Sequence, residues 1–162
     1  MSFRHDLNAG HQTKQIIVIR SDLRTKNGQK LPQGKEDAQV AHAAMAFLTR
    51  RLMPPKAAYA GCWLNFFKLW IYSWRGTVRL SGSFTSEELD WMEGSFRKVV
   101  LVAHDEQELL DIHQKAQEAG LEAHLITDSG YTCFDEPTHT CVGIGPHRAN
   151  KIDPITGHLK LR

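Results

Sequence analysis

The sequence has few cysteines, and they form no recognisable disulfide or metal pattern. The 162 residues include only Cys62, Cys133 and Cys141, with no C-x-x-C pair. An odd number of scattered cysteines argues against a disulfide framework and favours a reducing compartment. The first 14 residues also lack the apolar stretch of a secretory signal. We therefore expect a cytoplasmic protein.

Long uninterrupted apolar runs are missing as well. The most apolar stretch, residues 57–74, is broken by Asn65 and Lys68, so it is a poor candidate for a membrane span. We expect no membrane partner. With 41% hydrophobic residues, the chain is long enough for one domain with a real core and leaves little room for a second.

Acidic residues are absent from residues 38–86, although the net charge of the chain is only +2. Residues 1–86 carry 13 Lys and Arg against 4 Asp and Glu, a net charge of +9. Residues 87–162 carry 7 against 14, a net charge of −7. This split favours a polyanionic partner. The alternative is that acidic and basic surfaces face each other within the fold.

The apolar pattern predicts an α/β domain. Runs rich in β-branched residues predict strands at residues 15–20, 98–103, 121–127 and 140–144. Apolar spacing and capping signals predict helices from Lys35 to Pro54, from Thr85 to Trp91 and over residues 104–119. We expect a single three-layer domain, in which a small four-stranded mixed sheet is flanked by helices on both faces. An irregular tail is expected from Pro146.

Two segments stand apart from this pattern. Residues 1–13 are polar and aperiodic, so we expect a flexible tail before a domain that spans residues 14–162. Four aromatic residues then recur at helical spacing within residues 54–95, namely Trp63, Phe67, Trp70 and Trp74. Core packing is the simplest interpretation of this aromatic face, and a surface for a partner or nucleic acid is the alternative. The face also makes a homodimer worth testing.

One motif resembles a phosphate-binding loop and another a zinc site, but neither matches the pattern that such a site requires. The glycines at 28 and 34 with Lys35 resemble a P-loop, yet the spacing is one residue too long and Glu36 replaces the Mg²⁺-binding Ser or Thr. An anion near the start of the helix is the weaker expectation that survives. The spacings of Cys133, His139, Cys141 and His147 match no common zinc pattern, and we predict no metal.

Polar residues of two distant segments are expected at one edge of the sheet. Lys35, Gln39 and His42 share one helix face because they are spaced at i, i+4 and i+7. Asp128 ends a predicted strand, where open α/β sheets usually bind ligands. The hydroxyls of Thr132 and Thr140 follow shortly after it. A carboxylate and an ammonium that converge with hydroxyls can form an acyl-transfer site, although spacing alone does not show that they meet.

The same segments resemble the type II peptidyl-tRNA hydrolase family. R-S-D-L at 20–23 with G-K-E-D-A-Q-V-A-H-A at 34–43 is similar to the family's R-x-D-L and G-K-x-A-A-Q-x-x-H-A. D-S-G-Y-T at 128–132 with T-C-V-G-I-G-P at 140–146 is similar to D-A-G-R-T and T-x-x-x-I-G-P. The resemblance covers nearly all of residues 14–162.

The resemblance implies hydrolysis of the ester between a peptide and the 3′ ribose of tRNA, with no metal or organic cofactor. The implied partner is therefore peptidyl-tRNA. The catalytic residues that carry over are Lys35, Asp128, Thr132 and Thr140. The substrate-binding residues that carry over are Gln39, His42, Arg20 and Asp22.

The chain also departs from the family pattern. Tyr131 replaces the family's Arg, Cys133 replaces a polar residue, and Asp135 and Glu136 add negative charge in the following loop. The loop before Gly34 and the aromatic segment are longer than in the family. Two alternatives therefore stand beside the hydrolase: a non-catalytic RNA- or protein-binding module, and a hydrolase retargeted to another acyl substrate.

Overall fold

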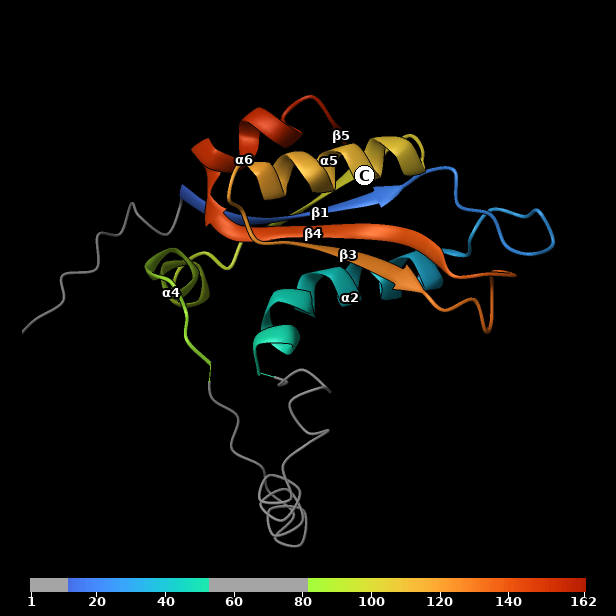
Figure 1. Cartoon of the computed structure of the whole chain (residues 1–162), viewed down its shortest axis with the longest axis horizontal. Coiled ribbons are helices and arrows are strands. Elements are labelled where there is room, and N and C mark those ends of the chain that lie inside the picture. The colour runs from blue at the N-terminus through green and yellow to red at the C-terminus, as the bar shows by residue number, and fades with distance from the viewer. Residues whose placement is uncertain (1–11, 53–81) are drawn as a thin grey trace, which may run out of the picture. The chain divides into compact units, whose positions relative to one another are not determined.

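The computed structural model describes residues 12–52 and 82–162 (Figure 1). Its elements, in chain order, are β1 (Thr13–Arg20), α2 (Gln33–Leu52), α4 (Ser86–Glu93), β2 (Lys98–Ala103), α5 (Glu106–Glu118), β3 (Ala123–Asp128), β4 (Thr138–Arg148), α6 (Ala149–Thr156) and β5 (Lys160–Leu161). The chain divides into two compact units, Met1–Phe47 with Phe84–Arg162, and Leu48–Ser83. The fold below is that of the first unit. Most of the predicted tail and of the aromatic segment lies outside the described residues.

The sheet has the strand order β3-β4-β1-β2-β5. β1 pairs in parallel with β2, whereas the pairs β1–β4, β3–β4 and β2–β5 are antiparallel. The prediction of a mixed sheet is confirmed, and the short β5 adds a fifth strand to the expected four. Figure 1 shows α2 on one face of this sheet, with α5 and α6 on the other.

The prediction of an irregular tail after Pro146 is wrong. β4 continues to Arg148, and α6 and β5 follow it. Asp153-Pro154 and Thr156-Gly157 are pairs that are common in turns. Ile152 and Ile155 are nevertheless buried against the sheet, and their burial holds this segment as a helix. Burial of apolar side chains outweighed the local turn preference.

Alternate residues of β1 supply the two cores. Ile16 and Val18 pack with residues of α5 and α6, whereas Ile17 and Ile19 pack towards α2. This alternation follows from the two-residue period of a strand. The α/β class and the expectation of helices on both faces are therefore confirmed.

A glycine lets α2 approach the sheet closely. A Cβ atom on Gly143 would lie 2.4 Å from the carbonyl oxygen of Ala43. Ala43 is itself a buried residue of α2. The Gln15 side-chain amide also donates a hydrogen bond of 2.9 Å to the Ala44 carbonyl. The small side chains of the buried Ala43 and Ala46 also allow this close approach. This short distance between α2 and β4 sets how close the polar side chains of α2 lie to the sheet.

The capped helical turn predicted near residue 85 is also present. The Thr85 hydroxyl accepts a hydrogen bond from the Glu88 amide, and the Glu88 carboxylate accepts one from the Thr85 amide. This capping box starts α4 and satisfies two otherwise unpaired backbone donors. Trp91 of the same helix is buried and packs edge-on against Phe47 at 5.8 Å between ring centroids.

Burial of Cys141 makes stability depend on alkaline pH. Burial raises the pKa of its thiol from 9.0 to about 12. As pH rises, the thiol therefore loses its proton in the unfolded chain before it does so in the folded chain. The stabilising contribution of the protonated thiol is complete below pH 9. Between pH 9 and about 12 the free energy of unfolding falls by about 1.4 kcal/mol per pH unit. We expect urea unfolding between pH 9 and 11 to show a shallower loss of stability in Cys141→Ala than in the unmodified chain. Equal pH slopes would contradict this assignment.

None of the helices within residues 12–52 and 82–162 combines the length and apolar composition needed to cross a bilayer.

Candidate active site

The carboxyl ends of β1 and β3, the start of β4 and the first turns of α2 lie at the same side of the sheet (Figure 1). The predicted site residues come from these elements and from the loops between them. The sequence expectation that these segments share one edge is therefore confirmed, and side-chain contacts show which residues meet.

Gln39 of α2 joins two of the predicted catalytic residues. Its amide nitrogen donates a hydrogen bond of 2.7 Å to Asp128 Oδ2, and its amide oxygen accepts one of 2.8 Å from the Thr140 hydroxyl. Gln39 is only 6% exposed and Thr140 is fully buried, so these polar groups depend on each other for hydrogen bonds. The network fixes the orientation of the Gln39 amide and, through it, the Asp128 carboxylate.

A β-bulge places Thr140 in this network. In the pairing of β3 with β4, Ile126 lies opposite Cys141 and Thr127 lies opposite His139, so Thr140 has no partner residue. Thr140 contacts Gln39 of α2, and Cys141 packs in the core cluster that includes Ala43 of the same helix. Two consecutive residues therefore face α2, which regular pleating would not allow.

The loop after β3 orients the Asp128 carboxylate from the other side. Asp128 Oδ1 accepts a hydrogen bond of 2.9 Å from the Gly130 amide. Gly130 has a φ of +85°, and a Cβ there would lie 2.8 Å from the Glu136 backbone, so this tight turn requires glycine. Each oxygen of Asp128 thus has one fixed donor and retains capacity for another.

Lys35 lies beside a third predicted residue. Its ammonium donates a hydrogen bond of 3.4 Å to the Thr132 hydroxyl, and both side chains are exposed. Among the described ion pairs, none joins Lys35 to Asp128. The ammonium at the first turn of α2 is therefore available to an anionic group of a ligand.

Arg20 and Asp22 form an internal network instead of standing free. The Arg20 guanidinium makes two hydrogen bonds of 2.9 Å to Asp22, one of 3.0 Å to Glu106 and one of 2.9 Å to the His139 carbonyl. The hydrogen bonds to Asp22 raise the pKa of Arg20, and the same contact lowers the pKa of Asp22. Four of the five guanidinium N–H groups are thus used within the chain.

One expected residue, His42, and one departure from the family pattern, Tyr131, lie outside these contacts. His42 is exposed on α2, and the structure shows no hydrogen bond from its side chain within the described residues. Tyr131, which stands where the family has Arg, is 91% exposed and points into solvent. The residues of the rejected zinc pattern show no ligand geometry either, because no three His, Cys, Asp or Glu side chains in the described ranges are grouped to hold a metal ion.

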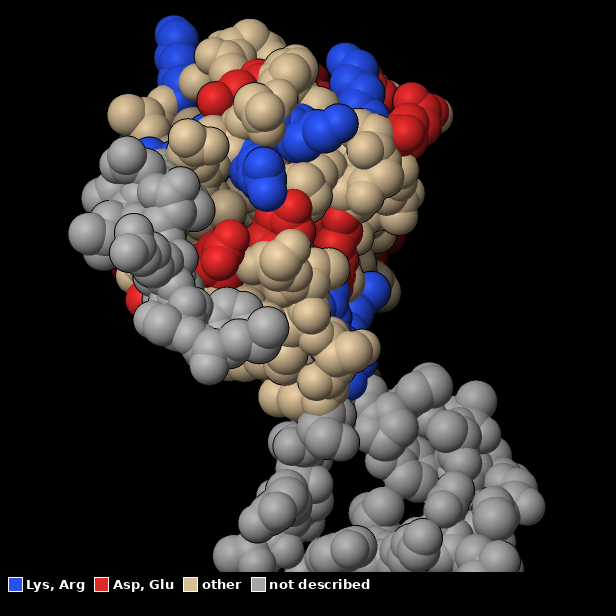
Figure 2. All heavy atoms as spheres, turned by 90° about the vertical axis from the view of Figure 1, so that its left-hand side faces the viewer, with Lys and Arg blue, Asp and Glu red and all other residues tan. Residues whose placement is uncertain are grey.

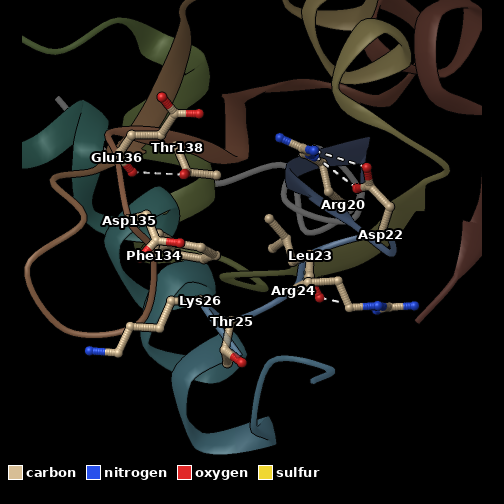
Figure 3. Close-up of a pocket in the computed structure, with 10 residues that line it drawn as sticks. All are labelled: Arg20, Asp22, Leu23, Arg24, Thr25, Lys26, Phe134, Asp135, Glu136 and Thr138. Carbon is tan, nitrogen blue, oxygen red and sulfur yellow. Dashed lines mark hydrogen bonds and ion pairs between the residues drawn. The ribbon is translucent and has the colours of Figure 1, made fainter. Parts of the chain in front are cut away.

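A pocket that the sequence did not predict lies at this edge (Figure 3). Its volume is about 280 Å³. It is lined by Arg20, Asp22, Leu23, Arg24, Thr25, Lys26, Phe134, Asp135, Glu136 and Thr138. Two loops far apart in the sequence form its walls, and a backbone hydrogen bond of 2.8 Å from the Lys26 amide to the Cys133 carbonyl joins them. The length of the loop before Gly34 was the only sequence signal for it.

Part of the charge split along the chain is used within the fold. Lys14 forms an ion pair with Asp153, and Arg20 pairs with Glu106, so residues of the basic half contact residues of the acidic half. Figure 2 shows the end of the molecule opposite the site, where Lys and Arg lie next to Asp and Glu on the coloured surface. Internal pairing therefore accounts for some of the split.

Comparison with known proteins agrees with the site. The family model described as "Peptidyl-tRNA hydrolase PTH2" matches residues 13–162. The peptidyl-tRNA hydrolase of Methanopyrus kandleri is 35% identical over 148 residues, covering 91% of this chain and 97% of that protein. The peptidyl-tRNA hydrolase of Methanocaldococcus jannaschii is 33% identical over 149 residues, covering 91% and 98%. Because the family model and both relatives extend over nearly the whole sequence, this chain belongs to the PTH2 family of peptidyl-tRNA hydrolases.

Proposed function

We propose that this chain hydrolyses the ester bond between a peptide and the 3′ ribose of tRNA, releasing both. Membership of the family supports this reaction. The structural observation that carries it is the buried Gln39 amide, which joins Asp128 to Thr140 beside the pair of Lys35 and Thr132. A carboxylate, an ammonium and hydroxyls held together in this way can activate water and stabilise the charge that develops on an ester.

Asp128 acts as the general base. Hydrogen bonds from Gly130 and Gln39 fix both of its oxygens, so the remaining lone pairs have defined directions. A water bound there loses a proton to the carboxylate as its oxygen attacks the ester carbonyl. The new C–O bond forms as the carbonyl electrons move onto oxygen. When the intermediate collapses, the C–O bond to the ribose breaks and the 3′ oxygen takes the proton from Asp128, which regenerates the carboxylate.

Lys35 stabilises the negative charge of this intermediate. Its ammonium is exposed at the first turn of α2, where the helix dipole also favours an anion. Thr132 accepts its hydrogen bond and so directs it towards the same edge as Asp128. A phosphate or ribose oxygen of the tRNA end is the second group that Lys35 can hold.

Gln39 and Thr140 act as positioning residues. Both are buried, so their hydrogen bonds serve mainly to hold Asp128 against α2. Arg20 and Asp22 hold β1 to β4 through the His139 carbonyl, one residue before Thr140. This contact supports the site, while direct binding of substrate by Arg20, Asp22 and His42 stays a prediction.

Ester cleavage with a matched pair of lysine variants tests the proposal. We expect the unmodified chain to release N-acetyl-amino acid from tRNA and Lys35→Ala to lower kcat/KM by about 10²- to 10³-fold, as for loss of one oxyanion donor. Lys115→Ala, on the exposed face of α5, is the control and should retain the activity. Absence of cleavage above spontaneous hydrolysis, with Lys35→Ala no different, would favour the non-catalytic binding module.

Cellular location and oligomeric state stay predictions from the sequence. Peptidyl-tRNA is a product of translation, which agrees with the cytoplasmic location predicted from the cysteines. A homodimer through the aromatic residues of 57–74 also stays a prediction, because those residues lie outside the described ranges. The molar mass of the full chain, measured by light scattering, distinguishes a monomer from a dimer.

A further inference from the structure

A buried carboxylate lies in the first turn of α2, directly after the proposed catalytic lysine. Glu36 is 3% exposed, and its carboxylate forms an ion pair with the Arg162 guanidinium. Within residues 12–52 and 82–162, this is the one side-chain partner of Glu36. The family motif G-K-x-A-A-Q leaves the position of Glu36 open, so the resemblance assigns this residue no role. The ion pair is therefore a feature that the family pattern does not account for.

Strand pairing brings Arg162 to this position. Leu161 of β5 pairs with Leu101 of β2, and the Arg162 amide donates a hydrogen bond of 3.1 Å to the Val100 carbonyl. Val100 packs against the core cluster that includes Ala43 of α2. The Arg162 backbone is thus fixed beside the core that α2 covers, while its side chain remains 29% exposed.

Contacts from both edges of the sheet hold the start of α2. The edge strands are β3 and β5. Arg162, which directly follows β5, binds Glu36, and Asp128 at the end of β3 accepts a hydrogen bond of 2.7 Å from Gln39. Lys35 directly precedes Glu36 in the same helical turn. The position of its backbone therefore depends on the contact from the β5 edge as well as on the site itself.

Without Arg162, the Glu36 carboxylate would be a buried charge with no partner. Such a charge is costly in a protein interior, so the carboxylate would move towards water. This movement would draw the first turn of α2 outward and carry Lys35 with it. A shift of about 1 Å in a group of an active site can lower the rate about 100-fold.

We propose that Arg162 is a positioning residue of this hydrolase, which keeps the Lys35 ammonium in place by neutralising Glu36. This inference rests on the proposed hydrolase function and adds a residue that acts through another side chain instead of touching the substrate. The two partners of the ion pair differ in their effects. Loss of Arg162 strands a buried charge, whereas loss of the Glu36 charge leaves a guanidinium that is already partly exposed.

Four variants of the full chain test this assignment by cleavage of N-acetyl-aminoacyl-tRNA at a temperature where each is folded. We expect Arg162→Ala to lower kcat roughly ten- to hundredfold and to change KM by less than about threefold, because Lys35 acts on charge that develops during the reaction. Arg162→Lys should keep kcat within about threefold of the unmodified chain, since one guanidinium nitrogen makes the contact. Glu36→Gln alone, and Glu36→Gln combined with Arg162→Ala, should also stay within about threefold.

The matched control is Asp153→Ala. It likewise removes the more exposed partner of an ion pair, because the side chain of Asp153 is 53% exposed and that of Lys14 is 14% exposed. This pair joins the start of β1 to α6, whereas the site lies at the other end of β1. Its loss should leave kcat unchanged, while urea unfolding records the change in stability of each variant.

An unchanged kcat in Arg162→Ala, or an equal fall in Asp153→Ala, would overturn the proposal. A double variant or an Arg162→Lys variant that is as impaired as Arg162→Ala would overturn it too, because the loss would then not come from the charge of Glu36. If Arg162→Ala does not fold, a double variant with kcat well below that of Glu36→Gln has the same consequence. Absence of cleavage by the unmodified chain would instead contradict the hydrolase function itself.

Discussion

Replacing Asp128 with asparagine is expected to lower kcat for ester cleavage by about 10²- to 10⁴-fold, the range for loss of a general base. Asparagine has nearly the same shape but cannot take a proton from water. The Gln39 amide can turn over, so that its oxygen accepts from the new amide and its nitrogen donates to Thr140. The hydrogen bonds of the site can therefore persist while the chemistry is lost.

The measurement is steady-state kinetics on N-acetyl-aminoacyl-tRNA, together with tRNA binding. KM and affinity should change little, because Asp128 acts mainly in the transition state. Asp111→Asn on α5 makes the same chemical change at an exposed position and serves as the control. An equal loss of binding and kcat would instead assign Asp128 a structural role.

Gly143→Ala is expected to destabilise the domain by about 3 kcal/mol, the upper part of the usual range for overpacking. The added Cβ would meet the Ala43 carbonyl oxygen at 2.4 Å, and this contact is with backbone. A side chain could rotate away, whereas here α2 must move outward as a whole. Because Gln39 lies on α2, the movement also lengthens its hydrogen bonds to Asp128 and Thr140.

Urea unfolding measures the loss of stability, and ester cleavage should fall in parallel at temperatures where the variant remains folded. Gly34→Ala is the matched control, since a Cβ at Gly34 would have no atom within 4 Å. Its stability should change by less than about 1 kcal/mol. Equal stability of the two variants would show that the approach of α2 to β4 is less constrained than the structure indicates.

The sequence predicted the elements whose signals are local. β-branched runs identified the four main strands, and the Thr85–Glu88 spacing identified the start of α4. α6 was missed because its signal, the burial of Ile152 and Ile155, depends on the sheet that it covers. The bulge at Thr140 was missed for a similar reason, since pairing between β3 and β4 has no signature in either strand alone.

The site was predictable as a set of residues but not as an arrangement. Helix spacing and the end of a predicted strand pointed to Lys35, Gln39, Asp128, Thr132 and Thr140, and resemblance to the family assigned their roles. That Gln39 lies between Asp128 and Thr140 depends on the depth of α2 over the sheet. The pocket depends on two loops that meet through Lys26 and Cys133, a contact between residues more than a hundred positions apart.

The bulge at Thr140 also shows how easily this fold can be separated from its chemistry. Residues on both sides of Thr140 already pair with β3, His139 with Thr127 and Cys141 with Ile126. Loss of a single codon at this position would close the ladder into regular pairing and leave every other strand partner unchanged. Such a descendant would keep the core and the pocket but lose the hydroxyl that holds Gln39. Thr140 is therefore a residue that the site needs and the pairing of β3 with β4 does not.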